Sequence, residues 1–308
     1  MYMYAAAVAT NNYLEGQRHY SDLTEHEQKL VMSVDHMLES FHYIGKNKIP
    51  QQLRDINRKI FLDSGAFSAF TLNKEITVQE YCEFIHLNRD IILIDDGIPM
   101  IAGLDGIGDA LLTYNNLKLM ESYGCPAIPC FHAGEDEAYL EYYIKYYPYI
   151  ALGGMVGQGV SQLRMWLDRI WEKYLIDGSG NARVKVHGFG ITSFDLMWMF
   201  PWYSVDSSTW IQAASFGMIM TAEYGNISVS TKSPSRHLKD QHFCNVSKDE
   251  QEYLLTNLIG RKGFNYVRLS TSYQSRVAYN IEAYRDINKA AIDRRTAQVN
   301  HHIQQDLF

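Results

Sequence analysis

Cysteine is scarce in this chain, and its spacing does not suit a metal cluster or a disulfide framework. There are four cysteines among 308 residues, with no CxxC pair. A chain of this length builds a core without disulfide staples, so we expect reduced thiols and a cytoplasmic location. Long apolar runs are also missing, since none approaches the roughly 20 residues of a membrane span. The first residues lack the basic segment of a signal peptide, and we interpret them as a strand.

An excess of positive charge is missing as well. The formal net charge is −7, which argues against nucleic-acid binding by the whole surface. One exception lies between residues 259 and 295, where eight basic side chains accompany three acidic ones. Basic runs are more often solvated helix faces, and that alternative stays open. The candidate nucleic-acid contacts in this basic strip are Arg261, Lys262, Arg268 and Arg276.

Apolar residues make up 46% of the chain, enough for a large folded core. Apolar runs alternate with helix-like segments through the first two thirds of the sequence. Eight alternating units predict a (β/α)8 TIM barrel. A doubly wound sheet is the alternative, although no GxGxxG sequence follows the first run. The eight runs span residues 2–8, 37–43, 59–63, 91–95, 127–132, 149–153, 184–188 and 203–206.

The alternation ends after the eighth run. Two apolar segments, 217–221 and 227–231, flank a Glu-Tyr-Gly-Asn sequence and predict a β-hairpin. Helical patterns close the chain. We therefore expect a barrel over residues 1–216. Residues 217–308 would form a hairpin and helices packed on it, within the same domain.

Two of the apolar runs end on an aspartate followed by a serine. The sequence IFLDSGAFS begins at Ile60 and presents Asp63, and WYSVDSS begins at Trp202 and presents Asp206. Parallel strands deliver their last residues to one edge of a sheet, so the two aspartates suggest a catalytic carboxylate pair. The alternative is that each aspartate caps the helix that follows it.

The residues at the ends of the eight runs share a chemical character. Acids, histidines and glycines dominate, with few cations, which predicts a pocket for an uncharged hydrogen-bonding ligand. These residues are Ser40, His42, Asp63, Ser64, Asp95, Asp96, His132, Gly153, Gly154, His187, Gly188 and Asp206.

Five of these strand ends, in order, resemble motifs of the tRNA-guanine transglycosylase superfamily. DSGAF at Asp63 resembles the DSGGFQ of that family, and IDD at Asp95 is similar to its FDE. ALGGM around Gly153 resembles GGL, and HGFG at His187 resembles MGVG. Asp206 stands where the family has its nucleophile. Each motif alone is weak, but five in order are fairly specific, and they cover about half of the chain.

The chain also departs from that family. Zinc-bearing members carry a CxCxxC cluster and a distant histidine after the nucleophile strand. Here that region offers only His237, His242 and Cys244, so we expect no metal. We also expect no added RNA-binding domain. The chain therefore resembles most the phage and bacterial branch that places 7-deazaguanine bases into DNA.

The resemblance implies an exchange of guanine in DNA for a 7-deazaguanine base such as preQ0, without a cofactor. Asp206 would be the nucleophile and Asp63 the general acid and base. A phage-encoded enzyme of this kind would act in the host cytoplasm. The residues implied to bind substrate are Ser64, Phe67, Asp95, His132, Gly153, Gly154, His187 and Gly188.

Three alternatives remain open at this stage. The same exchange on tRNA is one, and a different barrel enzyme with paired acids, such as a lyase or glycosidase, is another. The third is an inactive barrel that binds nucleic acid or a partner enzyme. The sequence does not predict the oligomeric state.

Overall fold

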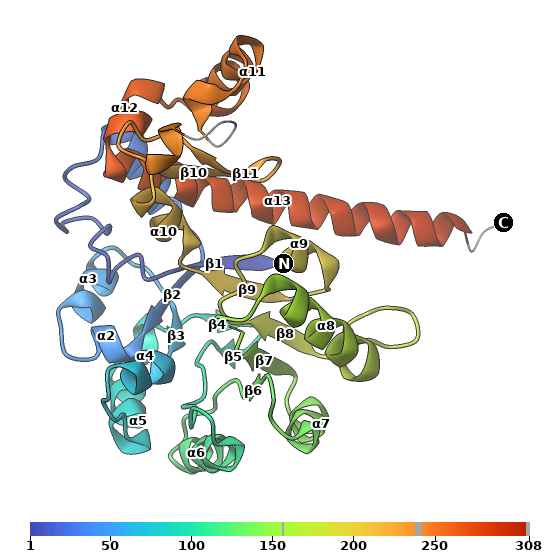
Figure 1. Ribbon diagram of the computed structural model, residues 1–308. Helices are drawn as coiled ribbons and strands as arrows, with labels where there is room; N and C mark the ends of the chain where they lie inside the picture. The colour runs from blue at the N-terminus through green and yellow to red at the C-terminus, as the bar shows by residue number, and fades with distance from the viewer. Residues whose placement is uncertain (156, 238–241, 306–308) are drawn as a thin grey trace. The chain divides into compact units, whose positions relative to one another are not determined.

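The chain folds into two compact units in the computed structural model (Figure 1). The sheet unit comprises Met1–Asn11 and His36–Ser207, and the helical unit comprises Asn12–Asp35 and Ser208–Phe308. The expected boundary lay at residue 216, and the helical unit takes in a segment between the first two strands. The structure describes residues 1–155, 157–237 and 242–305, with the backbone alone for 291–305.

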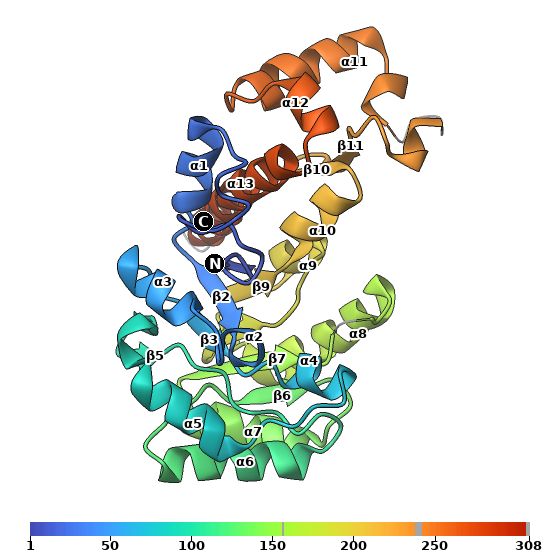
Figure 2. The same cartoon turned by 90° about the vertical axis from the view of Figure 1, so that its left-hand side faces the viewer.

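The sheet unit is built on seven parallel strands in the order β3-β2-β1-β9-β8-β7-β6. The sheet is curled, and helices lie around its outer side (Figure 2). Most strands follow the apolar runs, because parallel strands covered by helices are buried on both faces. The strands are β1 (Tyr2–Ala6), β2 (Met37–Ser40), β3 (Phe61–Asp63), β6 (Cys130–His132), β7 (Tyr149–Gly153), β8 (Lys185–Gly188) and β9 (Ser204–Ser207).

The chain between β3 and β6 contacts both edges of this sheet without forming a regular strand there. Leu62 forms an isolated parallel bridge to Ile101, and Ala102 forms one to Ile128, just before β6. The amide of Ile128 donates to the carbonyl of Ile101 at 2.7 Å. The described residues therefore form a curled seven-stranded parallel sheet, whereas the sequence predicted a closed barrel of eight strands.

The difference arises at the fourth expected strand, residues 91–95. Here β4 (Ile94–Asp95) pairs antiparallel with β5 (Ile98–Pro99). Asp96 and Gly97 form the turn between them with φ of 47° and 77°. An Asp-Gly pair suits such a turn because both positions need positive φ. The chain therefore doubles back at this hairpin before it continues alongside β3 and β6.

Helices of the sheet unit begin at well-formed caps. Thr77 and Glu80 form a capping box at the start of α5. Asp109 and Asp136 cap α6 and α7 by accepting backbone N–H bonds. Such caps satisfy the free amides of the first turn and define where each helix begins. The helices are α2 (Phe41–Ile44), α3 (Ile49–Asp55), α4 (Ala66–Thr71), α5 (Val78–Leu87), α6 (Ala110–Ser122), α7 (Glu137–Tyr146), α8 (Val160–Ile170) and α9 (Phe194–Met199).

The inward side chains of the strands form one apolar cluster, which includes Leu38, Phe61, Cys130 and Ala151. Side chains along a strand alternate between its two faces, so the residue two positions further on points to the same side. The core therefore sets the direction of the polar residues at the carboxyl ends. These residues are Ser40, Asp63 and His132.

The helical unit contains the predicted hairpin, and the structure confirms it as β10 (Met218–Thr221) and β11 (Gly225–Ser228). The long helix α13 packs against α1, α10 and β10. Asn280 of α13 joins them, since it accepts from Met220 N at 2.8 Å and donates to Trp210 O at 2.9 Å. No described helix combines the length and apolar character needed to cross a membrane. The helices are α1 (Glu25–Met32), α10 (Thr209–Ser215), α11 (Lys248–Tyr253), α12 (Tyr266–Thr271) and α13 (Tyr273–Gln305).

A fully buried carboxyl on β2 makes the stability of the sheet unit depend on pH. Glu39 is 0% exposed and accepts from Ala9 N at 2.5 Å, Thr10 N at 3.2 Å and Thr10 Oγ1 at 2.7 Å. Burial raises the pKa of Glu39 to about 7, although these hydrogen bonds act to lower it. The folded state therefore holds the proton more tightly than the unfolded chain does.

We expect the stabilisation from the Glu39 proton to be complete below pH 4.5 and to be lost as pH rises through 7. The shift in pKa corresponds to about 3 kcal/mol between these limits. Glu39→Gln should remove this pH dependence. The substitution can also change the free energy of unfolding by an amount that is the same at every pH, and this change does not affect the test. Denaturant unfolding between pH 4.5 and 8.5 would measure both slopes. Equal slopes for the variant and the parent would contradict the prediction.

Candidate active site

Asp63 is the last residue of β3, and its carboxylate is held by two donors. Ser40, at the end of the neighbouring strand β2, donates its hydroxyl to Oδ2 at 2.6 Å, and Gly65 N donates to the same oxygen at 3.1 Å. Gly65 has φ of 74°, and a Cβ there would lie 2.5 Å from His42 Cβ. A residue other than glycine would thus be strained and crowded at this turn. The turn fixes the direction of the Asp63 side chain.

The pKa of Asp63 is raised to about 6. Burial is the largest cause, and the negative charges of Asp206 and Asp105 add to it, while the hydrogen bond from Ser40 opposes the rise. Desolvation and like charges both disfavour the ionised form of a carboxyl. Asp63 can therefore exchange a proton near neutral pH, as a general acid or base must.

Asp206 of β9 is held from one side only. Its Oδ1 accepts from Gly190 N at 3.0 Å and lies 3.2 Å from His187 Nε2. His187 Nδ1 in turn lies 2.5 Å from the hydroxyl of Ser204. Among the described residues, none forms a hydrogen bond with Asp206 Oδ2. One oxygen of this carboxylate is thus anchored, and the other is left for a reacting group.

His187 was predicted to contact substrate, but the structure gives it a supporting place. Its side chain is 0% exposed and both ring nitrogens are engaged, by Asp206 and Ser204. Gly188 was predicted likewise, yet a Cβ there would lie 2.8 Å from Ile191 and 3.0 Å from Trp202. His187 therefore orients Asp206, and Gly188 allows close packing at the end of β8.

His132, at the end of β6, lies between two acids. Its Nε2 is 3.2 Å from Asp105 Oδ2 and its Nδ1 is 3.0 Å from Glu135 Oε1. Burial by itself lowers the pKa of His132, but negative charge around the ring outweighs burial and raises its pKa. We assign the rise to Asp105, because burial raises the pKa of the neighbouring Cys130 thiol to about 12 and keeps it neutral.

Asp105 lies at the carboxyl edge of the sheet, where Asp95 was expected. It follows the segment that bridges β3 and β6, and it pairs with His132. Its Oδ1 is buried and has no hydrogen-bond partner in the described part of the chain. The Asp-Gly turn at residues 96–97 was the signal that the chain doubles back and that the next apolar run ends at Asp105.

Asp95 itself lies away from these acids. Its Oδ2 is 3.4 Å from Lys185 Nζ, which also binds Asp96 at 2.5 Å and the Tyr203 hydroxyl at 2.9 Å. Lys185 begins β8 and Tyr203 precedes β9, so this cluster marks the amino ends of the strands. The pKa of Lys185 is raised by these partners despite the opposing effect of burial. The structure does not bring Asp95 together with Asp63 and Asp206.

The remaining predicted substrate contacts differ in exposure. Phe67 of α4 is 53% exposed, whereas Ser64 is buried and accepts from Ala66 N. A Cβ on Gly153 would lie 2.8 Å from Cys130 Sγ, and Gly154 has φ of 70°. Side chains are therefore excluded at both glycines beside His132, and of the two only Gly154 is exposed.

Two arginines of the predicted basic strip are used inside the helical unit. Arg268 forms a two-pronged ion pair with Glu27, with distances of 2.8 and 2.7 Å. Arg276 is 6% exposed and donates to the carbonyls of Ala214 and Leu269. Both side chains hold neighbouring segments together, which removes them from the expected nucleic-acid surface.

Lys262 is likewise paired, with Asp286, and its ammonium lies 4.9 Å from the centre of the Tyr279 ring. Arg261 is exposed. Of the four predicted nucleic-acid contacts, Arg261 alone combines exposure with no side-chain partner among the described residues.

The residues considered for zinc have other roles in the helical unit. His242 is 2% exposed, and its nitrogens bond to Ser230 O at 3.0 Å and Cys244 N at 3.1 Å. Cys244 Sγ lies 3.4 Å from the Tyr266 hydroxyl, and His237 is exposed. Neither nitrogen of His242 is directed at Cys244 Sγ as a shared metal would require.

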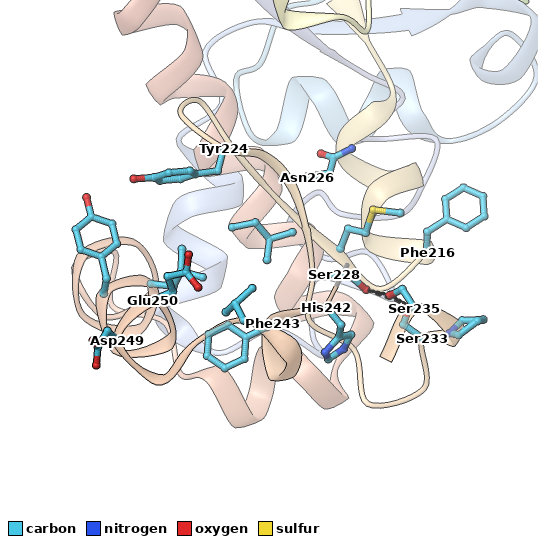
Figure 3. A pocket seen from close by; sticks show the side chains of 16 residues that line it. Phe216, Tyr224, Asn226, Ser228, Ser233, Ser235, His242, Phe243, Asp249 and Glu250 are labelled. Atoms are coloured by element: carbon cyan, nitrogen blue, oxygen red, sulfur yellow. Dashed lines mark hydrogen bonds between the residues drawn. The ribbon is translucent and has the colours of Figure 1, made fainter. Parts of the chain in front are cut away.

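A separate pocket of about 1020 Å³ lies in the helical unit (Figure 3). Its wall is largely aromatic and aliphatic, with Asp249 and Glu250 as its charged residues. Such a lining suits an apolar ligand and disfavours phosphate. It contains no residue predicted to bind substrate. A hydrogen-bonded serine cluster lines one side, formed by Ser228, Ser233 and Ser235.

No protein-family model and no curated protein matches this sequence. The interpretation of the site therefore rests on the residues and their geometry.

Two substitutions should move the pKa of Asp63 in opposite directions. Ser40→Ala removes a hydrogen bond to the carboxylate and should raise the pKa by about 1 unit. Asp206→Asn removes a repelling charge and should lower it. Carbon-detected NMR titration of the Asp63 carboxyl would measure both shifts. A fall in the serine variant, or a rise in the asparagine variant, would show that the described contacts do not govern Asp63.

Proposed function

We propose that this protein is a transglycosylase that exchanges guanine in DNA for a 7-deazaguanine base through a covalent glycosyl-aspartate intermediate. The observation that carries the proposal is the pair Asp63 and Asp206. They come from distant strands, interact electrostatically and have different environments. One carboxyl has a pKa raised to about 6, so it can exchange a proton near neutral pH, and the other has an oxygen without a described partner, the division of labour that such chemistry needs.

The fold supports the proposal if the sheet is a variant (β/α)8 barrel. Seven positions are regular strands, and we propose that the segment bridging β3 and β6 fills the eighth. Its carboxyl end then presents Asp105 beside the other strand ends. Active sites of such barrels form at this face.

In the first half of the proposed reaction, Asp206 Oδ2 attacks C1′ of the deoxyribose. The bond from C1′ to guanine N9 breaks, its electron pair leaves with the base, and Asp63 donates the proton that makes the departing guanine neutral. In the second half, the Asp63 carboxylate takes the N9 proton of the incoming base while N9 attacks C1′. The bond to Asp206 breaks, and both carboxyls return to their starting states.

Recognition of the purine edge falls to Asp105 in place of Asp95. The unpartnered Oδ1 of Asp105 can accept from N1–H and the 2-amino group of guanine. Backbone at Gly153 and Gly154 can approach the ring closely, and exposed Phe67 offers a stacking face. We keep His132 as the group that orients Asp105, and the exchange itself uses no cofactor.

We favour DNA as the substrate and a base such as preQ0 as the incoming group, in the cytoplasm of the producing or infected cell. This choice rests on the resemblance to the DNA-modifying branch. Three of the four predicted basic contacts are engaged internally, so we do not assign the nucleic-acid backbone to Lys262, Arg268 or Arg276. A guanine within a duplex must leave the stack to reach these carboxyls.

Trapping the covalent intermediate distinguishes the two carboxyls. Each variant is incubated with guanine-containing DNA and no incoming base, then denatured and examined for protein–DNA adduct. Asp206→Asn should give none, because the nucleophile is lost. Asp63→Asn should form the adduct slowly, because water can still protonate the departing base.

The pattern of adducts decides between the alternatives. Adduct with Asp206→Asn but not with Asp63→Asn would reverse the two roles. Adduct with tRNA and none with DNA would change the substrate. If the parent protein forms no adduct with either nucleic acid, the transglycosylase proposal fails.

The first half-reaction should depend on pH through Asp63. Departure of guanine needs the protonated carboxyl, and its pKa is about 6. Adduct formation should therefore slow about tenfold per pH unit above 6. Asp63→Asn should show a slow rate without this dependence, measured by quenched single-turnover assays from pH 5 to 8. A flat profile for the parent protein would remove Asp63 as the acid.

A further inference from the structure

Three side chains with different metal-binding atoms meet at the carboxyl ends of the sheet unit. Asp105, Cys130 and His132 each offer one donor atom, and all three atoms lie within 4.8 Å of one another. His132 Nε2 is 3.2 Å from Asp105 Oδ2 and 3.5 Å from Cys130 Sγ. Around a tetrahedral zinc ion, the bond lengths imply about 3.4 Å between nitrogen and oxygen and about 3.6 Å between nitrogen and sulfur. The two distances from His132 Nε2 are therefore close to the edge lengths of a tetrahedron.

Glu135 holds His132 through Nδ1, as a carboxylate often holds a metal-binding histidine. Its Oε1 lies 3.0 Å from His132 Nδ1, and its Oε2 accepts from His132 N at 2.9 Å. A carboxylate at Nδ1 keeps the proton on that nitrogen and directs Nε2 toward Asp105 and Cys130. The same carboxylate–histidine arrangement recurs at protein metal centres, where it raises the basicity of the ligand.

The backbone of residue 153 lies close to two of the donors, which a glycine permits. A Cβ at Gly153 would lie 2.8 Å from Cys130 Sγ and 3.1 Å from His132 Nε2. Any side chain there would fill the space next to two of the three donors. With three protein ligands and one free position, a bound metal would keep a place for water or another small ligand.

We propose that Asp105, Cys130 and His132 bind one divalent cation of the zinc class. Sulfur, nitrogen and oxygen together suit zinc or cobalt better than magnesium or calcium, which prefer oxygen alone. Binding would release the Cys130 thiol proton and any proton on His132 Nε2 to solvent, and the ion would replace them. Asp105 binds through one oxygen, so Oδ1 stays free. The proposal departs from the expectation of no metal and does not depend on the exchange reaction.

Cobalt(II) is the probe, because a cobalt–thiolate bond gives a charge-transfer absorption that reports the sulfur ligand directly. The full chain carrying Cys244→Ser is used, since Cys244 is exposed and a free surface thiol is a competing ligand for the probe. We expect one cobalt per chain with the charge-transfer band, and displacement of cobalt by zinc. Cys130→Ser should abolish the band, and Asp105→Asn and His132→Ala should weaken binding.

Cys125→Ser is the matched control. Cys125 is also buried, and its sulfur lies 3.4 Å from His86 Nε2. Among the described residues, however, Cys125 and His86 do not form a metal-binding group with a carboxylate. This variant should keep the band and the stoichiometry. Glu135→Gln keeps all three ligands and should lower the affinity 10- to 100-fold. Circular dichroism of each variant shows whether it is folded.

The outcomes separate this proposal from the proposed enzyme activity. Asp206→Asn should bind cobalt like the parent and lose exchange. Absence of the band in the folded parent, or a band that disappears with Cys125→Ser and survives Cys130→Ser, would refute the metal site. Neither of these results bears on the covalent adduct, which is measured without added metal.

Discussion

The site depends on one electrostatic constraint: a parallel sheet concentrates acids from distant parts of the chain at its carboxyl edge. The charges of Asp206 and Asp105 both raise the pKa of Asp63. Like charges in a partly buried space are costly unless donors hold them. Ser40, the amides of Gly65 and Gly190, and two histidines supply those donors. Each of these groups lies within the last two residues of a strand or just after it, so the register of the sheet determines the site.

The sequence predicted seven of the strands, and the positions of Asp63 and Asp206 at strand ends, because these signals are local. A buried parallel strand is an apolar run, and a polar residue that ends it marks the carboxyl edge. Asp63 and Asp206 both follow this rule. The same rule placed Asp95 wrongly at that edge, because the apolar run before it leads into a hairpin. The positive φ of Asp96 and Gly97 turns the chain back, and Asp105 reaches the edge instead.

Other residues could not be assigned from local pattern, because their roles depend on partners far along the chain. Arg268 belongs to a basic strip in the sequence, yet Glu27 neutralises it from a segment near the other end. His187 ends a strand as a substrate-binding histidine would, but the Ser204 hydroxyl and Asp206 occupy its nitrogens. The sequence shows which charged and hydrogen-bonding side chains are present. Only the contacts in the folded structure show which of them are free to bind a ligand.

The environments of Asp63 and Asp206 explain why the same side chain can perform two tasks. The Ser40 hydroxyl and the Gly65 amide both donate to Oδ2 of Asp63, and they do not offset its burial, so the pKa of this carboxyl is raised to about 6. Asp206 receives an amide and an imidazole on Oδ1, which orient it without covering Oδ2. A nucleophile needs an ionised, uncovered oxygen, and a general acid needs a proton it can give up. In the proposed exchange, the uncovered oxygen of Asp206 therefore fits the nucleophile, and the raised pKa of Asp63 fits the group that transfers the proton.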